Sequence, residues 1–117
     1  MAYYPIGGTQ FNMIRRFGQV AKLNPDMIEE YDALHSAVWN GVLKTIKECN
    51  IQNYSIYRKG EVLFAYFEYT GNDYEADMVK MAEDPLTRSW WTHTHPCFIQ
   101  EKPGEFYTDM KELFHID

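Results

Sequence analysis

Residues 24–48 read NPDMIEEYDALHSAVWNGVLKTIKE, and this stretch predicts one long helix. Asn24 and Pro25 form a helix-start signal, because Asn can cap free backbone amides and Pro at the first helical position lacks the donor that would go unpaired there. Apolar residues then recur with a helical period, at Ile28, Tyr31, Leu34, Val38, Val42 and Ile46. We therefore expect an amphipathic helix whose apolar stripe packs against the core.

His35 lies inside this apolar stripe. It comes four residues after Tyr31 and four before Trp39, so the three side chains project from one face of the predicted helix. A titratable imidazole between two amphipathic aromatic side chains is a candidate functional group. The alternative interpretation is a core histidine whose nitrogens are satisfied by local hydrogen bonds and that has no chemical role.

Three segments alternate in the way that strands do. They are residues 16–23, 51–58 and 62–69, with a hairpin at Gly60 between the second and third. Strict alternation in 51–58 places Ile51 on the same face as Tyr57, and Tyr54 on the opposite face.

The strand at 62–69 is apolar on both faces. A sheet that is covered by helices on one side only usually has a polar second face. The second face of this strand must therefore be covered, and a partner sheet or a ligand pocket are the two simplest covers.

The C-terminal half predicts two helices, at 73–82 and 85–92, followed by a loop at 92–104. Trp90 and Trp91 are adjacent, so on a helix they point about 100° apart, and one of them should face a cavity or an interface. Residues 105–116 predict a closing strand, although 107–111 also fits a helical turn. The order βαββαβ predicts an α+β sandwich of the ferredoxin-like type, with residues 15–117 as one domain and 1–14 as a flexible arm.

The composition excludes several classes of function. The chain of 117 residues has a net charge of −6, which does not suit a nucleic-acid binding face. No apolar run is long enough to span a membrane and no secretory signal is evident, so we expect a cytoplasmic protein that binds neither nucleic acid nor membrane. The two cysteines form no disulfide framework. Aromatic residues make up 16% of the chain, and Tyr and Trp line sites for sugars as well as cores.

Several short motifs, taken together and in order, resemble the L-rhamnose mutarotase family. The shared pieces are Gln19-Val20, Asn24-Pro25-Asp26, Glu29-Glu30-Tyr31, His35 followed by Trp39, Asn53-Tyr54-Ser55-Ile56-Tyr57, Leu63-Phe64 with Glu68, and Trp90-Trp91, with a weaker match at Glu112-Leu113-Phe114. One departure is Asn40, which stands where the family usually has Pro.

The resemblance implies a homodimer of ferredoxin-like domains whose sheets pack face to face as a dimeric α/β barrel. It implies an isomerase that interconverts the α and β anomers of L-rhamnose without a metal or organic cofactor. Carried over by motif position, the proton donor is His35 and the substrate contacts are Tyr31, Tyr54, Trp90 and Trp91. The second proton-transfer group stays open between Tyr31, Tyr54 and a bound water.

Other functions remain open at this point. The motifs fit L-fucose or another aldose as well as L-rhamnose, and the same fold also suits a cofactor-free oxygenase or a non-enzymatic sugar-binding dimer. His93, His95 and Cys97 resemble a metal cluster in composition, and on an extended loop both imidazoles would point the same way. No distant ligand accompanies them, so we predict a solvated loop and no metal site.

Overall fold

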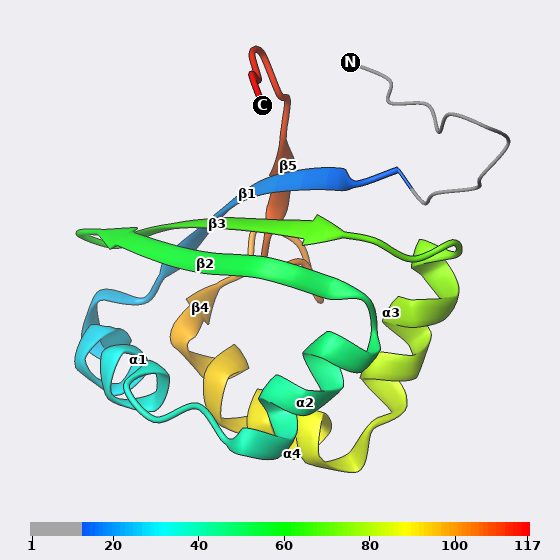
Figure 1. The fold of residues 1–117 in the computed structure, drawn as a ribbon. Coiled ribbons are helices and arrows are strands. Elements are labelled where there is room, and N and C mark those ends of the chain that lie inside the picture. Colours follow the sequence, from blue (N-terminus) through cyan, green and yellow to red (C-terminus); the bar gives the residue numbers. More distant parts are fainter. Residues whose placement is uncertain (1–12) are drawn as a thin grey trace, which may run out of the picture.

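The structure of the protein is a computed structural model that describes residues 13–117. Its elements, labelled in Figure 1, are β1 (Arg15–Leu23), the 3-10 turn η1 (Pro25–Met27), α1 (Ile28–His35), α2 (Asn40–Glu48), β2 (Ile51–Lys59), β3 (Val62–Tyr69), α3 (Tyr74–Glu83), α4 (Pro85–Thr94), the 3-10 turn η2 (His95–Cys97), β4 (Phe98–Ile99) and β5 (Thr108–Met110). Except for Met13 and Ile14, which are exposed, the predicted N-terminal arm lies outside the described residues.

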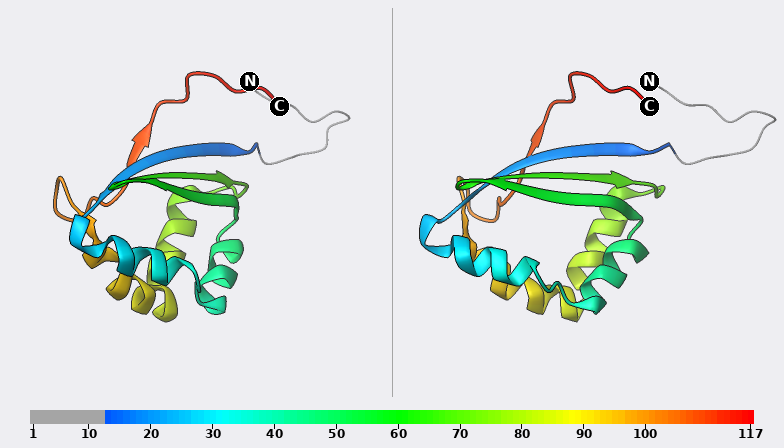
Figure 2. Two further views of the ribbon diagram at one scale, coloured as in Figure 1. Left: turned by 90° about the vertical axis from the view of Figure 1, so that its left-hand side faces the viewer. Right: turned by 60° about the vertical axis from the view of Figure 1, so that its left-hand side comes forward.

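One curled antiparallel sheet carries the fold. Its strand order is β2-β3-β1-β4, and β5 also pairs with β1. In both views of Figure 2, the helices lie on one side of this sheet and leave the other side uncovered. The order confirms the predicted α+β, ferredoxin-like fold, with each helical region divided in two.

The prediction of one long helix over residues 24–48 is wrong. α1 ends at His35 and α2 begins at Asn40, with Trp39 in an extended conformation between them. The Ser36 hydroxyl donates to the carbonyl of Ala33 at 2.7 Å, a local bond that competes with continuation of the helix. The break makes His35 the last residue of α1, where it borders the space between the helices and the sheet.

Strict alternation in β2 is also wrong. The pairing of β2 with β3 shifts between Gln52 and Ser55, and Asn53 takes a positive φ of 48°. Such a bulge adds one residue and changes the phase of the strand. Ile51 and Ile56 therefore both lie over the helix side, opposite Tyr69 and Ala65, although they are five residues apart.

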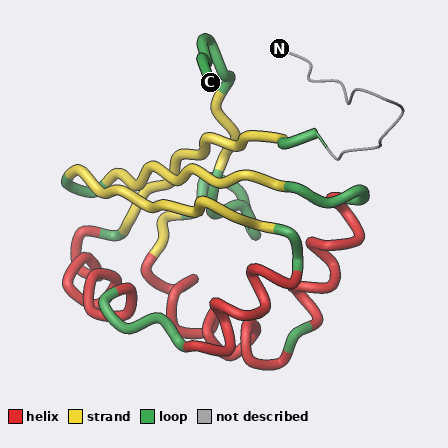
Figure 3. The backbone as a smooth tube through the Cα atoms, in the orientation of Figure 1, coloured by secondary structure: helices red, strands yellow, loops and turns green. Residues whose placement is uncertain are grey.

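The predicted loop at 92–104 and the predicted strand at 105–116 are both too long. α4 continues to Thr94 and is followed by η2 and the short strand β4. β5 ends at Met110, since its ladder with β1 covers only Gly18 to Val20. The tail beyond it has no regular structure, and its large apolar residues are 77–86% exposed: Leu113, Phe114 and Ile116. Figure 3 shows this tail leaving the sheet.

The core lies on the helix side of the sheet. Its larger cluster is made of Ala21, Leu23, Tyr31, Leu63 and Cys97. On the opposite face, Tyr57 is 67% exposed, Phe64 40% and Met110 43%. The second apolar face of β3 is therefore not covered by any helix of residues 13–117. None of the helices in this range is both long and apolar enough to cross a membrane.

Candidate active site

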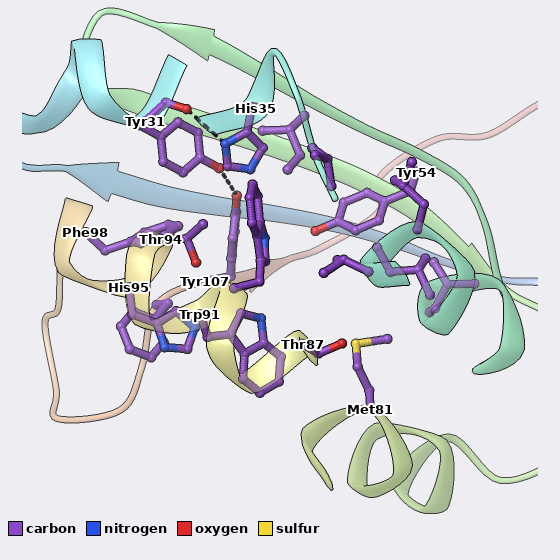
Figure 4. Close-up of a pocket in the computed structure, with 18 of the residues that line it drawn as sticks. Tyr31, His35, Tyr54, Met81, Thr87, Trp91, Thr94, His95, Phe98 and Tyr107 are labelled. Carbon is purple, nitrogen blue, oxygen red and sulfur yellow. Dashed lines mark hydrogen bonds between the residues drawn. The ribbon is translucent and has the colours of Figure 1, made fainter. Parts of the chain in front are cut away.

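A cavity of about 1380 Å³ opens between the helices and the concave side of the sheet. Its walls come from α1, α2, β2, α4 and the segment that leads into β5 (Figure 4). All five site residues predicted from the sequence line it: Tyr31, His35, Tyr54, Trp90 and Trp91. Their parent elements are far apart in the chain, so the fold is what brings them to one place.

Among residues 13–117, His35 has one ring nitrogen with a hydrogen-bond partner and one without. Its Nδ1 lies 3.0 Å from the backbone carbonyl oxygen of Tyr31. A carbonyl oxygen can only accept, so Nδ1 carries a proton and Nε2 of the neutral ring keeps its lone pair. Burial in the cavity wall lowers the pKa of His35 from its ordinary value. At neutral pH the ring is therefore neutral, and Nε2 is a proton acceptor.

Aromatic rings hold the imidazole in place. The ring of Tyr31 stacks on it with centroids 4.0 Å apart, and Trp90 meets it edge-on at 5.6 Å. Trp39, from the break between α1 and α2, packs edge-on against Trp90 at 5.2 Å. The orientation of His35 is thus fixed by two neighbouring rings as well as by its hydrogen bond.

Tyr54 reaches the cavity from the bulge in β2. Although 42% of its surface is exposed, its hydroxyl end points into the cavity (Figure 4), where burial raises its pKa. Its ring packs against Phe67 of β3, with centroids 5.6 Å apart. Tyr54 therefore presents a protonated hydroxyl to the same cavity that His35 lines.

The two tryptophans occupy different surroundings, as expected for adjacent helical residues. Trp90 is 5% exposed and is enclosed by His35 and Trp39. Trp91 is half-buried and stacks on His95, with centroids 5.2 Å apart. Both line the cavity, and Trp91 is the more open of the two.

The extended loop that would have gathered His93, His95 and Cys97 does not exist. All three residues lie on helical turns at the end of α4 and in η2. The ring of His95 is sandwiched between Trp91 and Phe106, while Cys97 is buried and donates its thiol to the carbonyl of His93. Within residues 13–117, no group of three or more His, Cys, Asp or Glu side chains is placed to hold a metal ion.

Tyr107 and His95 are cavity residues that the sequence analysis did not identify as site residues. The hydroxyl oxygens of Tyr31 and Tyr107 are 3.4 Å apart. Burial raises the pKa of Tyr31 to about 12 and also raises that of Tyr107, so both remain phenols at neutral pH. The only sequence signal for Tyr107 was its place in an aromatic pair, Phe106-Tyr107, beyond Gly104.

Chemically, the cavity combines one proton acceptor with several phenol donors between aromatic walls. This combination suits a ligand that has both apolar faces and hydroxyl groups. The model of the L-rhamnose mutarotase family (rhaM) matches residues 16–116 of this chain.

The chain belongs to the L-rhamnose mutarotase family.

Family membership is also supported by individual relatives. The chain is 34% identical to the L-rhamnose mutarotase of Ligilactobacillus salivarius, over 90% of this chain and all of that protein. It is 29% identical to the one from Oceanobacillus iheyensis, over 89% of this chain and all of that protein. The family resemblance seen in the sequence is thereby confirmed, and the family consists of isomerases that act on carbohydrates.

Solved structures show the same fold. The crystal structure of an L-rhamnose mutarotase from Formosa agariphila superposes with a TM-score of 0.69 at 19% identity, over 88% of this chain and 99% of that one. Tetracenomycin F2 cyclase from Streptomyces glaucescens, a type-II polyketide cyclase, superposes with a TM-score of 0.60 at 10% identity and the same coverage. The fold alone therefore does not separate sugar chemistry from polyketide chemistry.

Proposed function

We propose that this protein interconverts the α and β anomers of L-rhamnose and that His35 carries the proton transfer. The observation that carries the proposal is the free Nε2 of His35, which opens into a cavity shared with the four other residues singled out by the family motifs. The family match over residues 16–116 supports the choice of substrate.

The chemistry requires little more than a well-placed nitrogen. Mutarotation opens a hemiacetal: the anomeric hydroxyl loses a proton, the bond between C1 and the ring oxygen breaks, and the ring oxygen gains a proton. Both oxygens are bonded to C1, so a single nitrogen can reach both. Neutral His35 accepts the proton at Nε2, and the resulting imidazolium donates it to the ring oxygen. General acid–base catalysis of this kind contributes typically about 10²–10⁴-fold.

The aromatic walls bind the sugar in this proposal. Trp90 and Trp91 pack against the apolar face and the methyl group of the 6-deoxy sugar, because such surfaces gain from leaving water. The hydroxyl of Tyr54 binds ring hydroxyls, and the hydroxyl of Tyr31, whose ring stacks on His35, contacts the sugar close to C1. Ring closure on the other face of the aldehyde reverses the same proton transfers, so the mechanism calls on no metal or organic cofactor.

We also propose that the protein works as a homodimer. The uncovered face of the sheet carries Tyr57, Phe64 and Met110, and the apolar side chains of the tail lie exposed beyond it. A contiguous apolar surface of this kind is unfavourable in water and is typical of an interface. A second copy of the chain, packed sheet to sheet, covers it in the manner that the family resemblance implies.

Saturation-transfer NMR on L-rhamnose tests the function directly. The wild-type protein should accelerate exchange between the anomers, and His35→Ala should return the rate to that of the spontaneous reaction with an unchanged circular dichroism spectrum. His93→Ala is a matched control, since this exposed histidine of α4 does not line the cavity. An unchanged rate in His35→Ala rejects His35 as the proton carrier. Faster exchange with L-fucose than with L-rhamnose moves the assignment to that sugar.

A further inference from the structure

Tyr107 lies in the cavity wall and has no role in the function proposed above. It precedes β5, whose first residue donates its hydroxyl, Thr108 Oγ1, to the carbonyl of Val20 at 3.4 Å. The ring of Tyr107 packs edge-on against Phe98, with centroids 5.5 Å apart. The central strand β1 and the core therefore hold this tyrosine from two sides, and its hydroxyl has a defined position.

The hydroxyls of Tyr31 and Tyr107 act as a pair. They lie 3.4 Å apart, and either oxygen can be the donor. In such a pair one O–H is used between the two phenols, and the other O–H remains available to a ligand. Because burial raises the pKa of both groups, the pair keeps both protons at neutral pH and offers a donor, not a base.

The pair lies next to the proton acceptor. Tyr31 stacks on the His35 ring at 4.0 Å, and its own carbonyl holds Nδ1 of that ring. Figure 4 shows the two phenol oxygens beside the imidazole, at the same end of the cavity. One wall therefore presents a neutral imidazole acceptor and a free phenol donor side by side, which are the two groups that the two oxygens on C1 require.

We propose that the Tyr31–Tyr107 hydroxyl pair supplies the hydrogen bond that stabilises the ring oxygen while the sugar opens. The inference rests on the proposed function. As Nε2 of His35 removes the proton from the anomeric hydroxyl, the electrons of the bond between C1 and the ring oxygen move onto that oxygen. The free O–H of the pair hydrogen-bonds to the growing negative charge and keeps its own proton. The proton that finally arrives comes from the imidazolium, so no proton is gained or lost overall.

Tyr107→Phe tests this role, because it removes one oxygen and keeps the ring that packs on Phe98. A donor that acts on charge formed in the transition state affects kcat more than KM. We expect kcat for L-rhamnose exchange to fall roughly 10- to 100-fold, with KM changed by less than about twofold. Tyr74→Phe is the control, since Tyr74 lies on α3 and does not line the cavity.

Two further readouts separate this role from a structural one. The pH profile of Tyr107→Phe should keep the acid limb of the wild type, because the groups that face His35 remain: Asp32 on its own helix, the stacked Tyr31, and Trp90 from α4. Since the hydroxyls work as a pair, the variant with both Tyr31→Phe and Tyr107→Phe should be about as slow as the slower single variant.

The outcomes are distinguishable. A wild-type protein that does not accelerate anomer exchange overturns the proposed function and this inference with it. An active wild type and an inactive His35→Ala, together with a Tyr107→Phe variant at the wild-type kcat, overturn the inference alone. A rise in KM with kcat unchanged, or multiplicative losses in the double variant, also overturn it, since they indicate uniform binding or independent contacts.

Discussion

At the level of single residues, Tyr31 contacts His35 twice, through its carbonyl and through its ring. The spacing of four residues makes both contacts possible within one helix, so they could be anticipated from the sequence. The sequence could not show which ring nitrogen is free, because that depends on the distance of 3.0 Å between Nδ1 and the carbonyl oxygen of Tyr31. The structure adds that the resting ring is neutral, with Nε2 as the nitrogen that can accept a proton.

The pH dependence of the reaction follows from this protonation state. Burial lowers the pKa of His35 below its ordinary value of 6.5. The imidazole therefore stays neutral at a lower pH than a free histidine does. We expect kcat/KM for L-rhamnose exchange to be level near neutral pH and to fall as the pH drops through a midpoint below 6.5. Rates measured between pH 4.5 and 8 check this. A limb centred above 6.5 contradicts it.

The same shift predicts an effect on stability. As the pH falls below about 6.5, the unfolded chain binds a proton at His35 before the folded protein does. His35 therefore lowers the free energy of unfolding in acid and has no such effect above that pH. In urea titrations, His35→Gln should gain stability relative to the wild type between pH 7.5 and pH 5. A constant difference between the two proteins argues against a buried neutral ring.

At the level of elements, Asp84 joins the two helices that flank the cavity. Its carboxylate caps α4 by accepting from the backbone amide of Thr87 at 2.9 Å and from the Thr87 hydroxyl at 2.8 Å. It also accepts from the hydroxyl of Thr45 on α2 at 3.2 Å. This cap fixes the start of the helix that carries Trp90 and Trp91.

Asp84→Ala should therefore destabilise the protein more than a substitution that removes only a helix cap. It leaves the hydroxyl of Thr87, which is 2% exposed, without this acceptor, and it leaves the hydroxyl of Thr45 with only the carbonyl of Gly41, at 3.1 Å. Asp73→Ala is the matched control, because Asp73 caps α3 through a single bond to the amide of Ala76. Thermal unfolding should show the larger fall in Tm for Asp84→Ala, and NMR exchange should show a higher KM for L-rhamnose. Equal falls in Tm contradict a role in joining α2 to α4.

The elements also show how far patterns along the chain can be trusted. The predicted strands 16–23, 51–58 and 62–69 match β1, β2 and β3 within one residue at each end, because alternation and the turn at Gly60 are local signals. The break after His35 and the bulge at Asn53 were missed. The break involves one short hydrogen bond from the side chain of Ser36, and the bulge involves one left-handed residue, Asn53. A periodic pattern over many residues does not reveal such single-residue features.

At the level of the whole molecule, the helices of residues 13–117 cover one side of the sheet only. The open face pairs Val20 with Phe64 and Phe64 with Tyr57, so apolar side chains adjoin across three strands. The expectation that the second face of β3 needs a cover stays a prediction for the assembled protein, since the described residues of one chain do not supply it.

A charge in the centre of this face should prevent assembly. For the wild type, light scattering after size exclusion should give a mass of about twice the 13.9 kDa of one chain. Phe64→Glu should shift the protein to the mass of one chain, because a buried unpaired carboxylate is strongly unfavourable. Val79→Glu is the control, since Val79 is 55% exposed on α3, away from this face. A wild type with the mass of one chain rejects the homodimer.

The sequence by itself determined the fold class, the family and five of the residues that line the cavity. Alternation, helix-start signals and ordered motifs each involve residues that are close together in the sequence, so they can be recognised without a structure. Only the tertiary structure decided that α1 ends at His35, that the bulge directs Tyr54 inward, and that Tyr107 joins Tyr31. Each of these depends on contacts between residues far apart in the chain or on a single departure from regular geometry, and the order of residues alone does not record such contacts.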